Sequence, residues 1–382
     1  MQIPVNLPRN AAISLVVVVA VLVNCALFIV LGFREGGDAA RYAAGADSLL
    51  RGEPLTARQQ VYFGYIWLLA GIKWLGVDQR AVYALQIGAS CGAALAAFQL
   101  GRLYGGTLVG VITALVWALN YDIQKWNFYL LTESLFFSSV MVSCWLIMRP
   151  LEKGRNLLVA LLSLLVMASL RFNGFVFALL MLAALAVAVL GRARALVVGA
   201  LLLLAVMPSA AAITPDRGRD GGSGLAREGT LGFLTEGQVI WDTVKISMPS
   251  EGASSGSLAG DLTRYVVAHP LAVSRLYLYR LGHYLFAWNP YFSGKHIVVT
   301  TAQWLVVYVL ATIGWLAIRR RGNRAMTMLP ALFVCQGILV VLTVGDYDGR
   351  YSLYAAPALF PFVAVGLCEV VLSRFSRQPQ PV

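Results

Sequence analysis

Charged side chains are scarce in this sequence. Only 13% of the 382 residues are charged, whereas 59% are hydrophobic, and the mean hydropathy is +0.73. A typical soluble domain carries about 25% charged residues. This scarcity excludes an ordinary soluble domain and indicates an all-α polytopic membrane protein.

Residue patterns for disulfide, metal and nucleotide chemistry are also missing. The five cysteines all lie within apolar stretches, which is typical of packing residues and not of a disulfide framework or a metal site. His269, His283 and His296 are too far apart for a helical metal-binding pair. No phosphate-binding glycine loop follows a strand, so the chain has no recognisable nucleotide site. We find no internal repeat and no separate soluble domain.

The basic residues set the expected topology. The formal net charge is +12, but the cations are scattered in short clusters between apolar runs, so we expect no nucleic-acid partner. Apolar runs long enough for helices across roughly 30 Å of hydrocarbon predict about ten transmembrane helices. They cover residues 11–32, 81–101, 107–120, 130–148, 157–171, 174–190, 195–213, 298–318, 326–344 and 352–372.

Residues 61–77, "VYFGYIWLLAGIKWLGV", pose the one ambiguity, because they are apolar but short and rich in Trp and Tyr. If they do not cross, the later basic loops and the tail fall on the same side as Arg9, which the positive-inside rule makes cytoplasmic. We therefore expect both termini inside and residues 61–77 to lie as an interfacial helix on the outer surface.

This topology makes residues 1–382 a single membrane domain with two larger outer segments. The first outer loop covers 33–80 and the long outer loop covers 214–297. Within the long loop, we expect Gly-rich residues 216–230 to be the most mobile segment. We expect a pocket that opens outward between the first outer loop, the turn at 120–133 and the long loop.

Two carboxylates on the outer side are candidate catalytic groups. Asp38 follows two glycines just after the first span and suits a helix N-cap, with Gly52 as the stop, a role that does not exclude catalysis. Glu133 lies near the outer end of an apolar helix, where an ionisable group is costly and indicates function. Asp122, in the same turn, is a weaker candidate for substrate binding.

Several cations are expected at the same depth. Lys125, Arg171 and Arg350 each belong to a different outer turn, and each alone is also typical of an interfacial anchor. Together they are a plausible clamp for a phosphate, because Arg offers bidentate contacts. Arg280 and His283 belong to an aromatic-rich stretch that predicts an interfacial helix, and they are further candidate substrate contacts.

Four short stretches carry a family resemblance: "GGDAARYAAGADSLLRGEP", "LLTESLFF", "LRFNGFVF" and "DGRYSLYAAPALFPFVAVGL". Together they resemble the GT-C type of membrane glycosyltransferase, nearest to the group with the protein mannosyltransferases and the lipid A aminoarabinose transferase. "GGDAARYAAGADSLLRGEP", which contains Tyr42, resembles the first outer loop of these enzymes, and "LLTESLFF" their fourth-span entrance. "LRFNGFVF" is similar to their arginine-containing hairpin. "DGRYSLYAAPALFPFVAVGL" resembles their final outer turn, with Arg350 and Tyr351 as an Arg-Tyr pair. The chain is short for the group and has one acid after its glycines where the mannosyltransferases have two.

The resemblance implies transfer of a sugar from a polyprenyl-phosphate donor to a glycan, lipid or protein acceptor outside the cytoplasm, at a bacterial inner membrane. It makes Asp38 the general base of an inverting reaction and Glu133 the second acid. Cations can stabilise the leaving phosphate, so this chemistry requires no metal or other cofactor. A divalent cation shared by Asp38 and Glu133 stays an open alternative.

Three other functions remain open at this stage. A lipid-sugar flippase or transporter is expected to carry ionisable groups near the bilayer midplane, whereas here they gather at the outer ends of the spans. An O-antigen polymerase or ligase would depend chiefly on outer-loop arginines, and Asp38 would be dispensable. A scaffold protein would depend on none of these residues.

Overall fold

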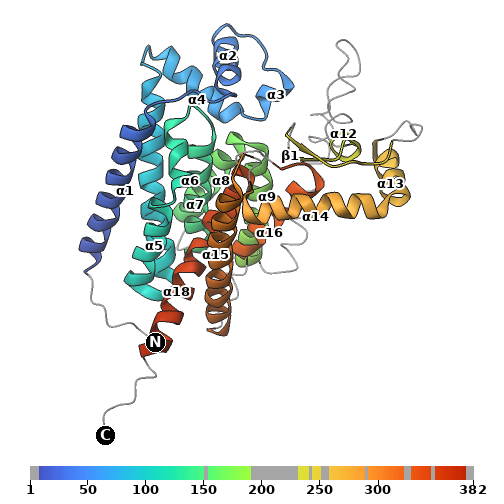
Figure 1. Ribbon diagram of the computed structural model, residues 1–382. Coiled ribbons are helices and arrows are strands. Elements are labelled where there is room, and N and C mark those ends of the chain that lie inside the picture. Colours follow the sequence, from blue (N-terminus) through green and yellow to red (C-terminus); the bar gives the residue numbers. More distant parts are fainter. Residues whose placement is uncertain are drawn as a thin grey trace. The chain divides into compact units, whose positions relative to one another are not determined.

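The protein is mostly helical (Figure 1). The computed structural model describes residues 8–149, 154–190, 231–240, 243–250, 258–288, 291–321, 328–345 and 349–375. The predicted span at 195–213 and the segment 216–230, which we expect to be mobile, lie outside the described residues.

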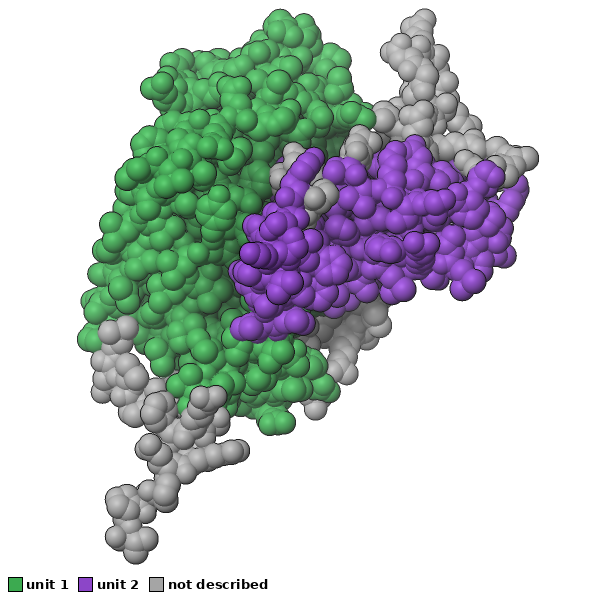
Figure 2. Space-filling view, viewed as in Figure 1, with its two compact units in different colours: residues 1–199, 307–332, 353–382 green, residues 200–306, 333–352 purple. Residues whose placement is uncertain are grey.

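The chain divides into two compact units (Figure 2). Unit 1 comprises residues 1–199, 307–332 and 353–382, and unit 2 comprises 200–306 and 333–352. Each unit is described by itself below.

Unit 1 is a helical bundle. α5 packs against α1, α7 and α18, α7 packs against α8, and α2 packs against α4. Its elements are α1 (Arg9–Leu31), α2 (Ala39–Leu50), α3 (Ala57–Gln60), α4 (Phe63–Trp74), α5 (Arg80–Ala118), α6 (Tyr121–Gln124), η1 (Lys125–Phe128), α7 (Glu133–Met148), α8 (Gly154–Leu170), α9 (Phe172–Leu190), η4 (Ala356–Ala358) and α18 (Phe360–Phe375). Three helices join the units: α15 (Gly294–Arg320), α16 (Met328–Leu342) and α17 (Arg350–Ala355).

Several helices are long and apolar enough to span a membrane, as expected for a membrane protein. In the described part of the chain there are three, α1, α5 and α15, or four if the bent pair of α17–η4 and α18 counts as one span. α7, α8, α9 and α16 are apolar but shorter. The membrane character that the composition predicts is thus supported. The predicted number of ten spans is larger than the number of such helices in the described residues.

α5 is a helical hairpin, although its residues follow one another without a loop. Gly105 and Gly106 have non-helical backbone angles, and Gly106 has φ +80°, a conformation that favours glycine. The two arms lie against each other, because Trp117 Nε1 donates a hydrogen bond to the carbonyl of Ser90 at 3.1 Å. The arms correspond to the predicted segments 81–101 and 107–120.

The last predicted span, 352–372, is bent. Its two halves, Arg350–Ala358 and Phe360–Val371, meet at 63°. Pro357 lies just before the break and Pro361 just after it, and neither can donate a backbone hydrogen bond to continue a helix. The predicted span 352–372 is thus a bent one, and these prolines are a physical reason for the bend.

The loops of unit 1 form two groups of contacts. At one end, the backbone of Arg34 pairs with Tyr129, and Arg171 lies over the ring of Tyr62 at 5.5 Å. At the other end, Arg321 forms an ion pair with Glu369 and donates to the carbonyl of Tyr104 at 3.4 Å. The first group contains the segments predicted outside, and the second contains segments predicted inside.

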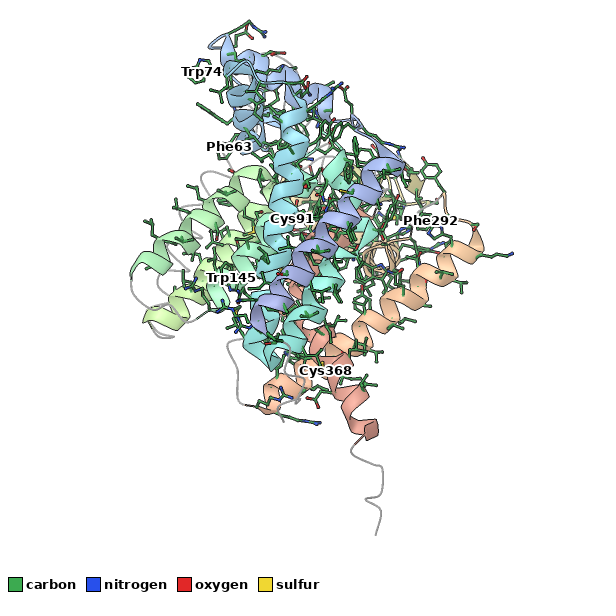
Figure 3. All side chains as sticks on the ribbon, turned by 90° about the vertical axis from the view of Figure 1, so that its left-hand side faces the viewer. Phe63, Trp74, Cys91, Trp145, Phe292 and Cys368 are labelled. Carbon is green, nitrogen blue, oxygen red and sulfur yellow. The ribbon has the colours of Figure 1, made fainter. Side chains whose placement is uncertain are left out.

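α4 covers most of the ambiguous segment 61–77. Its 12 residues span about 18 Å as a helix, too short to cross the bilayer. Both of its ends lie near α2 or its loop, since Lys73 forms a salt bridge with Asp47 of α2 at 2.6 Å. Phe63 and Trp74 are exposed on one face, and Figure 3 shows both at the same end of the unit. This geometry agrees with an interfacial helix.

Unit 2 is built around a small sheet and a long helix. It holds α12 (Gly232–Thr235), β1 (Gln238–Ile240), β2 (Val244–Lys245), α13 (Leu258–Ala268) and α14 (Pro270–Phe286). β1 and β2 pair antiparallel, and β1 packs against α14. The core contains Leu234, Val239, Ile240, Tyr265, Val273 and Leu276.

Candidate functional site

In the first outer loop, a close contact between Gly36 and Leu131 lies just before Asp38. A Cβ on Gly36 would lie 2.5 Å from Cδ1 of Leu131, so a larger residue here would require the Leu131 side chain to move. Asp38 then stands immediately before α2, but its side chain accepts no capping hydrogen bond from the helix. Its carboxylate instead pairs with Arg41 at 3.2 Å, and both side chains are about one third exposed, 37% for Arg41 and 30% for Asp38. The side chain of Asp38 therefore does not cap α2 as expected. The expected helix stop at Gly52, with φ +74°, is confirmed.

A buried polar network fixes the turn at 120–133. The amide nitrogen of Gln86 donates to the carbonyls of Asn127 and Tyr129, at 3.2 and 2.9 Å. Asn127 in turn donates to Asn24 of α1 at 2.8 Å. Because these buried groups are paired, the segment that leads into Glu133 is held against α1 and α5.

Glu133 and Arg171 form a buried ion pair below this turn. Nη1 of Arg171 donates to Oε1 of Glu133 at 2.6 Å and to Oγ1 of Thr132 at 2.8 Å. The Glu133 side chain is 1% exposed and that of Arg171 is 7% exposed. Two residues that the sequence nominated separately are thus direct partners.

Tyrosines surround this pair. The guanidinium of Arg171 lies 5.5 Å from the ring centre of Tyr62 and 4.8 Å from that of Tyr354. Tyr42 is fully buried, with its ring centre 5.1 Å from that of Tyr62. Burial raises the pKa of Tyr42 well above its usual range, and the Glu133 carboxylate raises it further, so the phenol stays neutral.

Lys125 and Asp122 pair with each other. Nζ of Lys125 is 3.1 Å from Oδ1 of Asp122, and the Lys125 ammonium lies 5.4 Å from the ring centre of Trp126. The Lys125 side chain is 21% exposed and that of Asp122 is 52% exposed. This pair lies in the same turn as the Glu133 segment, closer to solvent.

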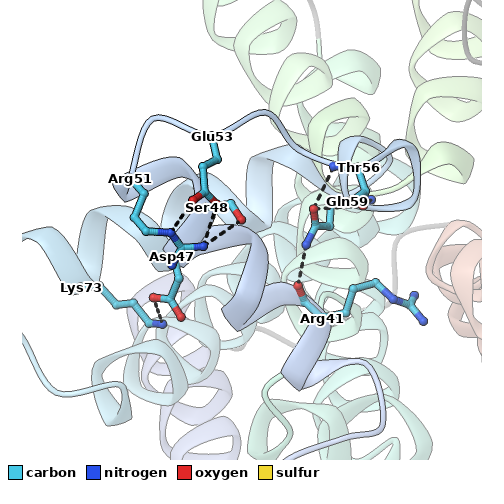
Figure 4. A network of polar contacts seen from close by, with 8 residues as sticks. All are labelled: Arg41, Asp47, Ser48, Arg51, Glu53, Thr56, Gln59 and Lys73. Carbon is cyan, nitrogen blue, oxygen red and sulfur yellow. Dashed lines mark hydrogen bonds and ion pairs between the residues drawn. The ribbon is translucent and has the colours of Figure 1, made fainter. Parts of the chain in front are cut away.

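Polar contacts hold α2, α3 and α4 together beside the site (Figure 4). Asp47 of α2 accepts from Lys73 of α4 at 2.6 Å. Gln59 of α3 donates to the carbonyl of Arg41 at 3.4 Å, while the guanidinium of Arg41 points away from this contact in Figure 4. These contacts therefore restrain the loop that carries Asp38 and Tyr42.

Arg280 and His283 lie on α14 of unit 2. Arg280 is fully buried and donates to the carbonyls of Phe233, Gln238 and Val341 at 2.8, 2.8 and 3.0 Å. Burial lowers the pKa of Arg280 to about 10. These contacts join α12, β1 and α16 through one side chain and favour a structural role over substrate binding.

His283 is partly buried, and its Nδ1 lies 3.0 Å from the carbonyl oxygen of Trp288. Burial lowers the pKa of His283, although the Trp288 contact opposes this shift. Arg350 and Tyr351 also belong to unit 2, where they open α17 after Gly349. The structure thus assembles Asp38, Tyr42, Asp122, Lys125, Glu133 and Arg171 within unit 1 and the other four nominated residues within unit 2.

Sequence reasoning missed the residues that surround Arg171. Thr132 directly precedes Glu133, and Tyr62 lies in a visibly aromatic stretch, so both carried a local signal. Tyr354 contacts Arg171 although the two are far apart in the sequence, and no local pattern indicates this contact. In the described ranges, no group of three or more His, Cys, Asp or Glu side chains has the arrangement of a metal site.

Comparison of the chain with protein-family models, with curated proteins and with solved structures finds no match.

Proposed function

We propose that this protein is an inverting membrane glycosyltransferase that takes a sugar from a polyprenyl-phosphate donor. The supporting observation is the arrangement in unit 1 of a partly exposed carboxylate, Asp38, directly before the helix that carries Tyr42. The ring of Tyr42 lies 5.1 Å from that of Tyr62, and the buried guanidinium of Arg171, paired with Glu133, lies 5.5 Å from the same Tyr62 ring. Ionisable groups in an apolar bundle are costly and mark functional sites. The resemblance of the four sequence stretches to GT-C enzymes supports the same assignment.

In this proposal Asp38 is the general base. It accepts the proton of an acceptor hydroxyl or amine as that atom forms a bond to the anomeric carbon. The bond from the anomeric carbon to the phosphate oxygen breaks, and the polyprenyl phosphate leaves with the electron pair. Attack from the face opposite the leaving group inverts the anomeric configuration.

The proposal includes a topology of about ten spans with both termini in the cytoplasm. The end of unit 1 that carries Asp38 then faces the periplasm of a bacterial inner membrane. Arg171 stabilises the charge of the leaving phosphate. Lys125 becomes available for the same purpose when it exchanges Asp122 for the ligand, because that pair is close to solvent.

Release of polyprenyl phosphate tests this function without knowledge of the acceptor. Purified protein in detergent is incubated with a panel of polyprenyl-phosphate sugars, with and without a membrane extract as the acceptor source. Protein-dependent release of polyprenyl phosphate that disappears in Asp38→Asn is the expected result. Movement of intact donor across a vesicle membrane without cleavage would instead identify a transporter.

A further inference from the structure

Arg171 is fixed along one edge of its guanidinium. Nη1 makes both of its hydrogen bonds to the described residues, to Glu133 and Thr132. The aromatic rings of Tyr62 and Tyr354 lie near the group at 5.5 and 4.8 Å. A guanidinium has five N–H donors in a rigid fork, so the Nε and Nη2 donors have no hydrogen bond within the described part of the chain.

A second hydrogen-bond donor near Arg171 is the hydroxyl of Tyr42. This hydroxyl is buried and has no hydrogen-bond partner among the described residues. The neighbouring Tyr65, by contrast, donates to Oε1 of Gln86 at 3.1 Å. Glu133, Arg171 and Asp38 all act electrostatically on Tyr42. Buried polar groups in native proteins are normally paired, and the place of this hydroxyl beside the Arg171 pair makes it a candidate contact for a ligand.

We propose that Glu133 is a positioning residue that holds Arg171, and that Tyr42 and the free edge of Arg171 together bind one oxyanion of the ligand. This rests on the proposed function, in which that oxyanion is a phosphate oxygen of the lipid-linked donor. Glu133 then takes no part in proton transfer. Of the two candidate carboxylates, Asp38 and Glu133, only Asp38 contacts the reacting atoms.

The surroundings of Glu133 support this division. Its Oε1 accepts from Arg171, and its Oε2 lies 3.4 Å from Oγ1 of Thr132. A general base must come within hydrogen-bond distance of the proton that it removes, whereas the two oxygens of Glu133 face Arg171 and Thr132. A buried ion pair is weak evidence for stability, since apolar replacements are often neutral or stabilising. The role of the ion pair is therefore to orient the guanidinium of Arg171.

Tyr42→Phe tests the subsite, because it removes only the unpaired oxygen. Binding of farnesyl monophosphate, farnesol and inorganic phosphate is measured on the full chain in detergent. We expect about tenfold weaker binding of farnesyl monophosphate, as for one lost hydrogen bond to an anion, with farnesol binding and melting temperature unchanged. Tyr104→Phe is the matched control, since Tyr104 has another buried hydroxyl without a partner in the described residues, at the opposite end of unit 1.

Two results would overturn the subsite. Tyr42→Phe that binds farnesyl monophosphate as wild type does excludes the hydroxyl as a ligand contact. Inorganic phosphate that binds as tightly as farnesyl monophosphate excludes the lipid-linked source.

Thr132→Val and Glu133→Gln test positioning. Thr132 makes no capping bond to α7, so Val removes one anchor of Arg171 without a change of charge. Both variants should raise KM for the donor, with the limbs of the pH–rate profile unchanged. A loss in kcat together with loss of one limb in Glu133→Gln would make Glu133 a proton-transfer group and overturn the proposal. If Glu133→Gln does not fold, Thr132→Val alone decides, because an unchanged KM contradicts positioning.

The binding assay separates this inference from the proposed function. Wild type that binds farnesyl monophosphate through Tyr42, but releases no polyprenyl phosphate from any donor, retains the subsite and refutes sugar transfer. Wild type that binds farnesyl monophosphate no better than farnesol refutes the subsite, whatever the transfer assay gives.

Discussion

Two acid–cation pairs in unit 1 differ chiefly in their access to water. Asp38 and Arg41 lie 3.2 Å apart with side chains that are 30% and 37% exposed, whereas Glu133 and Arg171 lie 2.6 Å apart with side chains that are 1% and 7% exposed. The first pair consists of neighbours on one helical turn. The second joins the start of α7 to the junction of α8 and α9.

The difference separates two tasks. An exposed pair is stabilised by at most about 1 kcal/mol, so Asp38 can exchange Arg41 for a ligand at low cost. A buried pair is expensive to break, since either partner left alone is an uncompensated charge. Asp38 is suited to a reaction in which its protonation state changes, and Glu133 is suited to a fixed position.

The largest effect is expected when the buried pair is broken. Glu133→Ala should lower the free energy of unfolding by about 3–5 kcal/mol, because Arg171 remains buried without its partner. Thermal melting in detergent measures this. The double variant Glu133→Leu with Arg171→Met should recover most of the loss, yet bind no phosphate-bearing ligand. Equal melting of Glu133→Ala and wild type would contradict the buried charge pair.

Asp38→Asn should change turnover and leave the fold intact. Loss of the proton acceptor should lower sugar transfer by about a hundredfold or more, while the melting temperature stays close to that of wild type because the lost ion pair is exposed. Transfer from a polyprenyl-phosphate sugar and melting are measured on the same preparation. Full activity in Asp38→Asn would remove the main reason to assign a general base here.

His283 extends the comparison of buried and exposed groups to unit 2. Burial lowers its pKa in the folded state, so below about pH 6.5 the unfolded chain binds a proton more readily than the folded one. Stability should therefore fall as pH falls through this range, until the folded-state pKa is also passed. His283→Gln, which does not titrate, should flatten this part of a melting-versus-pH curve. An identical curve for both proteins would exclude His283 as its source.

The smallest effects are expected at the exposed cations. Arg41→Ala and Lys125→Ala should each change the free energy of unfolding by less than about 1 kcal/mol. Raised salt should weaken these pairs but leave the Glu133–Arg171 pair nearly unaffected. A melting temperature of either alanine variant as low as that of Glu133→Ala would contradict the distinction between exposed and buried pairs.

Local sequence signals predicted the elements of unit 1 well. Turn glycines carried most of this information: Gly52 ends α2, and the pair at 105–106 falls in the gap between the predicted segments 81–101 and 107–120. The charge distribution predicted that 61–77 does not cross the membrane, and the short length of α4 agrees with this prediction. These features depend on neighbours in the chain, which a single sequence displays.

Partnerships between distant residues were beyond such reasoning. Glu133 was nominated by its cost in an apolar helix and Arg171 as a cation of an outer turn, but only the packing of α7 on α8 and α9 shows that they pair. Asp38 follows the sequence pattern of a capping residue, yet its side chain contacts Arg41. A charge one turn away competes with the helix terminus, and spacing alone does not decide between them.

The backbone pairing of Arg34 with Tyr129 has a consequence for biogenesis. The amide of Arg34 donates to the carbonyl of Phe128 at 2.8 Å, and the amide of Leu130 donates to the carbonyl of Arg34 at 3.0 Å. The loop that holds Asp38 is thus fastened to a segment that leaves the ribosome much later. At about 5–20 residues per second, the nascent chain spends several seconds in the membrane with Asp38 in place but its anchor unmade. The candidate site is therefore complete only when Arg171 has also been inserted and α7 has packed against α8 and α9.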